Sequence, residues 1–156
     1  MEFQTLKFQA VEKLKVADHL VGTTYPLVKE PKLLVSVIEN ISQALELTIT
    51  AILEYERDLK NIPKYDDTFT GKLEMFRRKV MTKHDIGSDV LDFVLDVRKT
   101  LEHHKNSTVE FTKKDKFVIS DNDYNVKTLN IDDVKKTLSK AKRHAEELFK
   151  IIKYES

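Results

Sequence analysis

The chain has 156 residues, of which 40% are hydrophobic and 34% charged, and its formal net charge at pH 7 is +1. This length predicts one domain, residues 1–156, with a core of its own, and the small net charge indicates no general affinity for nucleic acids. The absence of cysteine excludes disulfides, thiolate metal sites and cysteine nucleophiles. The N-terminal residues carry charges throughout, and no stretch approaches the roughly 18 apolar residues of a membrane span, so we expect a cytoplasmic protein.

Helical periodicity dominates the first part of the chain. Apolar residues at steps of three and four predict a helix over residues 2 to about 21, which Gly22 to Pro26 should end. Pro31 suits the first position of a second helix, because its missing N–H is not needed there. A wide apolar stripe extends this second helix to about residue 60, and its width predicts a central helix with several neighbours.

Two further helices follow in the middle of the chain. The first spans about residues 70–83, with Leu73, Phe76 and Val80 facing inward. After a break near His84, the second begins at about Ile86 and continues to about residue 105. It is the more apolar of the two, which indicates another central helix.

The pattern changes after residue 106. Short runs rich in aromatic and β-branched residues, between about residues 108 and 129, predict a small hairpin or meander. Asn130 is a good N-cap for a last helix that should reach about Tyr154. The predicted fold class is mainly α: an antiparallel four- or five-helix bundle with a β-type insertion before the last helix.

Known metal and phosphate motifs are missing from the sequence. No Glu is followed by His three residues later, there is no His-Glu-x-x-His, and the three glycines are not adjacent. These spacings are the signatures of di-metal bundles, zinc proteases and phosphate-binding loops. We therefore expect no metal and no cofactor.

One charged cluster ends the most apolar of the predicted helices. Arg98 and His103 are separated by four residues and Arg98 and His104 by five, with Lys99 and Lys105 beside them. On an ideal helix Arg98 and His103 lie about 140° apart, so they converge only if the helix ends there or a second chain approaches. Histidine moves protons near neutral pH, and arginine binds phosphate and stabilises developing charge. This chemistry suits metal-independent RNA cleavage by the 2′-hydroxyl.

Basic residues elsewhere in the chain are secondary candidates for contacts with RNA. Arg77 and Arg78 lie on the third predicted helix, and we include them with Lys99 and Lys105 as candidate RNA-binding residues.

The cluster resembles the Arg-x4–6-His motif of the HEPN superfamily, small helical-bundle proteins that include many metal-independent ribonucleases. The Glu-rich stretch from Glu39 to Leu47 and the order of motif helix, insertion and last helix are also similar to the family. The resemblance implies Arg98 as the phosphate-binding arginine, His103 or His104 as the acid/base, and a homodimer with the two motifs facing each other. The position after the arginine is commonly a small polar residue in active members, whereas here it is Lys99.

Three hypotheses remain open at the level of sequence. The first is a HEPN-like metal-independent RNA endonuclease. The second is a non-catalytic HEPN-like binding or regulatory subunit, for instance beside a nucleotidyltransferase-type partner. The third is a helical-bundle protein of unknown role, in which Arg98 only pairs with Glu102 four residues later and the histidines complement the dipole of the helix end.

Overall fold

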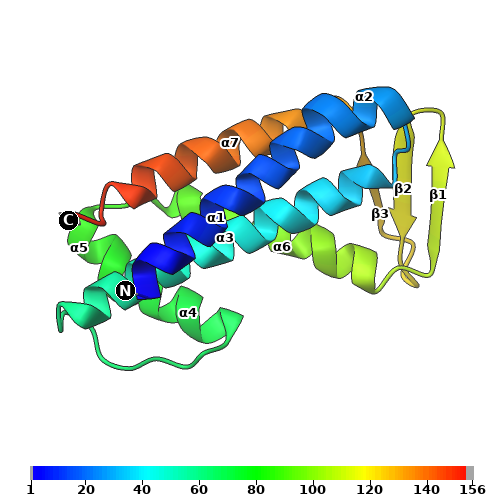
Figure 1. The fold of residues 1–156 in the computed structure, drawn as a ribbon. Helices are drawn as coiled ribbons and strands as arrows, with labels where there is room; N and C mark the ends of the chain where they lie inside the picture. The colour runs from blue at the N-terminus through cyan, green and yellow to red at the C-terminus, as the bar shows by residue number, and fades with distance from the viewer. Residues whose placement is uncertain (1, 154–156) are drawn as a thin grey trace.

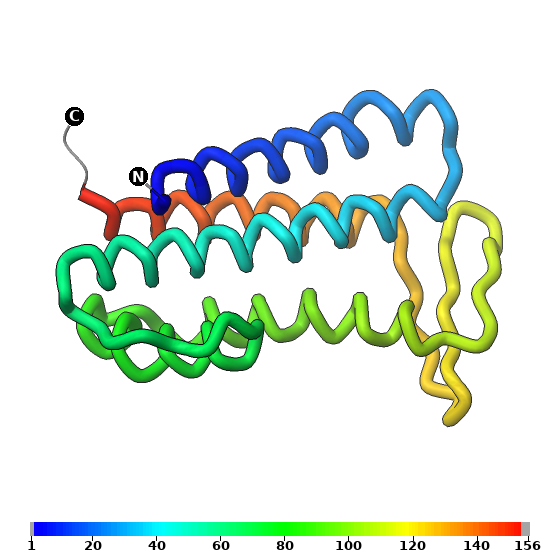
Figure 2. Tube along the Cα trace, turned by 60° about the horizontal axis from the view of Figure 1, so that its bottom comes forward, coloured from blue at the N-terminus to red at the C-terminus, as the bar shows by residue number. Residues whose placement is uncertain are grey.

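The computed structural model describes residues 2–153 and is mainly helical, with a three-stranded antiparallel sheet before the last helix, as expected. The long helices are α1 (Glu2–His19), α3 (Leu33–Asp58), α6 (Ser88–Lys105) and α7 (Ile131–Phe149). They lie side by side, and each runs opposite to the one before it (Figure 1). The sheet lies at one end of these helices, and α1 begins and α7 ends at the other end (Figure 2).

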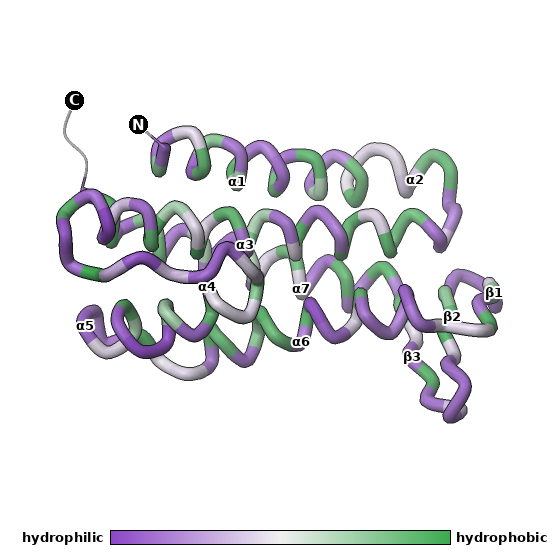
Figure 3. Tube along the Cα trace, turned by 90° about the horizontal axis from the view of Figure 1, so that it is seen from below, coloured by the Kyte–Doolittle hydropathy of each residue, from purple (hydrophilic) through white to green (hydrophobic). Residues whose placement is uncertain are grey.

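Helix α3 occupies the centre of the core. It packs most extensively on α1 and also contacts α6 and α7. Its buried side chains include Leu34, Ile41, Leu45 and Ile52. Hydrophobic and hydrophilic residues alternate along all four long helices, which places one face of each toward the core (Figure 3). Within residues 2–153, α3 alone meets the length and composition criteria for crossing a membrane, and 56% of its apolar stretch is buried inside the structure, as in a core helix.

The expected end of the first helix at Gly22 to Pro26 is wrong. Helix α1 continues through a π-helical turn, Leu20–Thr24, into α2, Tyr25–Val28. Pro26 lies in the first turn of α2, directly after the π-helical turn. Tyr25, which we expected in a loop, is buried. The helical segment ends only at Lys29, whose φ of 52° is left-handed.

The helical segment after α3 combines three elements. Helix α4 (Phe69–Met75) passes through a π-helical turn, Phe76–Met81, into the short helix α5 (Thr82–His84). The side chains expected to face inward, Leu73, Phe76 and Val80, are buried. The segment ends at Asp85, in a left-handed conformation, and this confirms the expected break.

The sheet is a meander of β1 (Val109–Lys113), β2 (Lys116–Ser120) and β3 (Val126–Leu129), in that order. Phe117, Ile119 and Leu129 are buried, so one face of the sheet extends the core at the end of the helices. The alternate residues Val109, Phe111 and Val126 are exposed on the opposite face.

Helix α7 begins and ends at well-defined points. The Asn130 side chain accepts a hydrogen bond from the Asp133 N–H, which confirms the expected N-cap. The helix ends at Phe149, earlier than expected, and Tyr154 lies outside the described residues.

Candidate functional site at the end of helix α6

The residues of the Arg/His motif lie on the last two turns of α6. This helix ends at Lys105, where the Asn106 N–H donates to the Glu102 carbonyl at 3.0 Å and Ser107 Oγ donates to the His104 carbonyl at 2.8 Å. Strand β1 begins shortly afterwards at Val109. This sharp change of direction brings the sheet against the end of the helix.

His104 is held by a carboxylate of the sheet. Its Nδ1 hydrogen bonds with Oε2 of Glu110 on β1, and the two side chains are 29% and 28% exposed. No other hydrogen bond joins the His104 ring to the described residues. A carboxylate on Nδ1 favours the tautomer that carries its proton there, so Nε2 is left free to accept a proton. Glu110 therefore orients the His104 ring and leaves its Nε2 without a hydrogen-bond partner among the described residues.

His103 has a different environment. Its Nε2 donates to the carbonyl of Ile119 on β2 at 3.2 Å, and its Nδ1 lies 3.9 Å from Asp121 Oδ2. The pKa of Asp121 is lowered, first by the backbone N–H of Asn125 and also by the charge of His103. Because one ring nitrogen is bonded to Ile119 on β2 and the other lies near Asp121, directly after that strand, His103 links α6 to the sheet.

Arg98 does not meet either histidine. Its guanidinium carbon lies 4.3 Å from the centre of the Phe69 ring on α4, and its Nε lies 3.9 Å from Glu102 Oε1. Six residues of helix place Arg98 about 9 Å along α6 from His104 and about 120° around it. The two side chains therefore lie on different sides of the same helix.

The other candidate basic residues are scattered. Lys99 and Lys105 are exposed on α6. Arg77 and Arg78 lie in the segment between α4 and α5 and both bind Glu74, at 2.7 Å and 3.5 Å. Figure 1 places this segment away from the sheet. Within one chain, each histidine contacts its own partner in or beside the sheet, whereas Arg77, Arg78 and Arg98 lie elsewhere.

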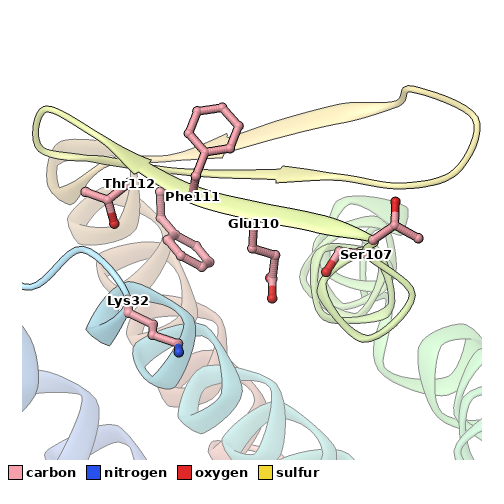
Figure 4. Close-up of a pocket in the computed structure, with 7 residues that line it drawn as sticks. Lys32, Ser107, Glu110, Phe111 and Thr112 are labelled. Carbon is pink, nitrogen blue, oxygen red and sulfur yellow. The ribbon is translucent and has the colours of Figure 1, made fainter.

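A pocket of about 450 Å³ adjoins the pair of His104 and Glu110. It lies between β1 and the start of α3, and its lining residues are Lys32, Ser107, Thr108, Glu110, Phe111, Thr112 and Phe117. Figure 4 shows the side chains of Lys32 and Glu110 on the helix side of β1. Neither Lys32 nor Glu110 was selected from the sequence, because only the fold of the insertion brings them near the motif. In the sequence, the one signal that could have placed Glu110 is strand alternation, which puts it on the face of β1 opposite to its exposed neighbours Val109 and Phe111.

A buried charged cluster lies at the opposite end of α3. The Glu56 side chain is 1% exposed and accepts hydrogen bonds from Asn61 at 2.8 Å, Lys83 at 3.0 Å and His84 at 2.7 Å. Burial alone would raise the pKa of Glu56, but these hydrogen bonds and the charge of Lys83 lower it below its ordinary value. The hydrogen bonds of Lys83 and His84 to Glu56 hold the end of α5 against α3.

His144 lies in an apolar environment. It belongs to α7 and is 3% exposed, and neither ring nitrogen has a hydrogen-bond partner within the part of the chain that the structure describes. Its ring lies 5.2 Å from that of Phe93 on α6. Burial lowers the pKa of His144, so the ring is neutral at pH 7. His144 therefore packs as part of the core. Among residues 2–153, no three His, Asp or Glu side chains are grouped to hold a metal ion.

Comparison with known proteins gives no match: no family model, curated protein or solved structure is significantly similar to this chain. The proposed function therefore rests on the contacts that His103 and His104 make at the end of α6.

Proposed function

We propose that the protein is a HEPN-like antiparallel helical bundle that acts as a metal-independent RNA endonuclease, with His104 as its acid/base. The observation that supports this proposal is the His104 ring, held through Nδ1 by Glu110, while Nε2 has no hydrogen-bond partner among residues 2–153. His103 is the weaker candidate because its Nε2 is bound to the Ile119 carbonyl. An oriented imidazole with one free nitrogen is suited to moving a proton at neutral pH.

The proposed reaction uses the ribose 2′-hydroxyl of the RNA as nucleophile. Nε2 of His104 takes the proton of this hydroxyl while its oxygen attacks the adjacent phosphorus atom. The bond from phosphorus to the 5′-oxygen breaks, that oxygen takes a proton from water, and His104 then returns its own proton to the solvent. The products are a 2′,3′-cyclic phosphate and a 5′-hydroxyl. An arginine at the phosphate would stabilise the charge that develops on it.

A homodimer would supply that arginine. Because Arg98 and His104 lie on different sides of α6, one chain alone does not direct both at one phosphate. In the proposed dimer, Arg98 of the partner subunit approaches His104 across the cleft.

The decisive experiment is cleavage of varied single-stranded RNAs in the presence of EDTA. We expect cleavage by the wild type, with 2′,3′-cyclic phosphate ends, and its loss in Arg98→Ala and His104→Ala. His19→Ala is the matched control, because His19 is an exposed histidine at the end of α1. Full activity in His104→Ala, or the same cleavage by all variants, would contradict the proposed role of His104.

A second candidate function is a non-catalytic binding or regulatory subunit, for instance beside a nucleotidyltransferase-type protein. It is favoured by the contacts of Arg98, which already stacks on Phe69 and lies near Glu102. An absence of cleavage on all RNAs, by a wild type that folds normally, would favour this function over the nuclease.

A further inference from the structure

The pocket beside Glu110 has the polar groups of a phosphate site. Lys32, at the start of α3, supplies an ammonium group, and the side chains of Ser107, Thr108 and Thr112 supply hydroxyls. The Ser107 hydroxyl donates its proton to the His104 carbonyl, so its oxygen can still accept a hydrogen bond. Ammonium groups and hydroxyls that converge on one space are suited to an oxyanion.

The charge around this pocket also favours an anion. The Lys32 ammonium forms no ion pair with any of residues 2–153, whereas the Glu110 carboxylate is engaged by His104. The turn that follows Thr112 in the β1–β2 hairpin carries three lysines, Lys113, Lys114 and Lys116, and one acidic residue, Asp115, so it is basic on balance. A free cation beside a basic turn attracts phosphate groups, and the volume of about 450 Å³ lies within the range of small-molecule sites.

We propose that this pocket binds one nucleotide of a single-stranded RNA, with its phosphate on Lys32 and its sugar and base lying along β1 between Ser107 and Thr112. The inference rests on the proposed function in one respect, because Glu110 both lines the pocket and holds His104. It assigns the substrate a position next to the acid/base. The apolar contribution comes from the Phe117 side chain, and most of the remaining lining is polar.

Glu110 then has two opposing effects. Its carboxylate orients His104, but it also repels the phosphate that enters the pocket. Glu110→Gln should therefore strengthen nucleotide binding while it weakens cleavage. A merely structural role for Glu110 predicts that binding and cleavage weaken together.

The test is a titration of the full chain with uridine 3′-monophosphate, followed by the NMR signals of the backbone amides and by calorimetry. Uridine and inorganic phosphate serve as separate ligands. We expect shifts at Ser107, Thr108 and Thr112, and roughly tenfold weaker binding in Lys32→Ala, because a hydrogen bond to a charged group is lost. Lys150→Ala is the matched control, because Lys150 is an exposed lysine at the far end of α7.

The outcomes separate this inference from the proposed function. Equal affinity of Lys32→Ala and wild type, or shifts confined to other parts of the chain, would overturn the nucleotide site even if RNA is cleaved. Inorganic phosphate that binds as tightly as the nucleotide would overturn the assignment to RNA. Binding that depends on Lys32, in a protein that cleaves no RNA, would support the site and contradict the nuclease.

Discussion

Replacement of the buried Glu56 carboxylate tests how the end of α5 is held to α3. Glu56→Gln keeps the shape of the side chain but removes the charge that Asn61, Lys83 and His84 share. Hydrogen bonds to a charged group contribute about 1.5–3 kcal/mol each when buried. The Lys83 and His84 side chains are 46% and 27% exposed, so water replaces part of the hydrogen bonding that they lose when the carboxylate is removed. We expect the free energy of unfolding to fall by about 2 kcal/mol.

The assay is urea unfolding followed by circular dichroism, with Glu39→Gln as the control. Glu39 is exposed on the same helix and forms no ion pair with the described residues. Because the folded pKa of Glu56 is lowered, the advantage of the wild type over Glu56→Gln is present above the ordinary value of 4.5 and is lost as pH falls through the folded value. Equal unfolding midpoints of Glu56→Gln and Glu39→Gln at pH 7 would refute the reasoning.

Three further predictions concern stability and use the same unfolding assay. His144→Leu removes two unpaired buried nitrogens, so we expect the variant to be at least as stable as the wild type at pH 7. Its advantage in free energy of unfolding should grow as pH falls below 6.5, because the folded wild type must keep the His144 ring neutral while the unfolded chain binds a proton. Lower stability of the variant at both pH values would contradict this. Gly71→Ala places a Cβ 2.6 Å from the Asp66 carbonyl oxygen, which should lower the free energy of unfolding by about 1–3 kcal/mol. In Gly22→Ala the new Cβ meets no atom within 4 Å, so this variant should be neutral or more stable. A larger loss of stability in Gly22→Ala than in Gly71→Ala would contradict the packing. Asn130→Ala removes the N-cap of α7 and should cost about 1 kcal/mol; an unchanged midpoint would show that the cap contributes nothing.

The helices could be predicted from sequence because their buried faces repeat with helical periodicity. The start of α7 follows from local chemistry, because the Asn130 side chain caps the helix. The second helix was expected to begin at Pro31, and α3 begins two residues later, at Leu33, after Lys32 in a helical conformation. The continuation past Gly22 could not be predicted, because a π-helical turn adds one residue to a turn and leaves no periodic signal. The apolar character of α6 did not predict which of its residues are buried, because Leu95 on this helix is exposed.

The candidate site was predictable only in part. The spacing of Arg98, His103 and His104 in the sequence identified the region, and the helix does end at the expected place. The separate environments of the two histidines depend on Glu110 and on the Ile119 carbonyl, which belong to the sheet. Contacts between a helix and a sheet have no fixed spacing along the sequence, so the periodicity of the sequence could not predict them. Glu56 was missed for a related reason, although it lies four residues after buried Ile52 on the same helix face.

The central position of α3 has a consequence for the synthesis of the protein. The chain emerges from the ribosome N-terminus first, so α3 is complete before α6 and α7 exist. At that stage its apolar surface is long enough to resemble a membrane span, and α1, its most extensive neighbour in the fold, is the one long helix already available to cover it. Early pairing of α1 with α3 would therefore shield the nascent chain from mistargeting and aggregation until the two later helices complete the core.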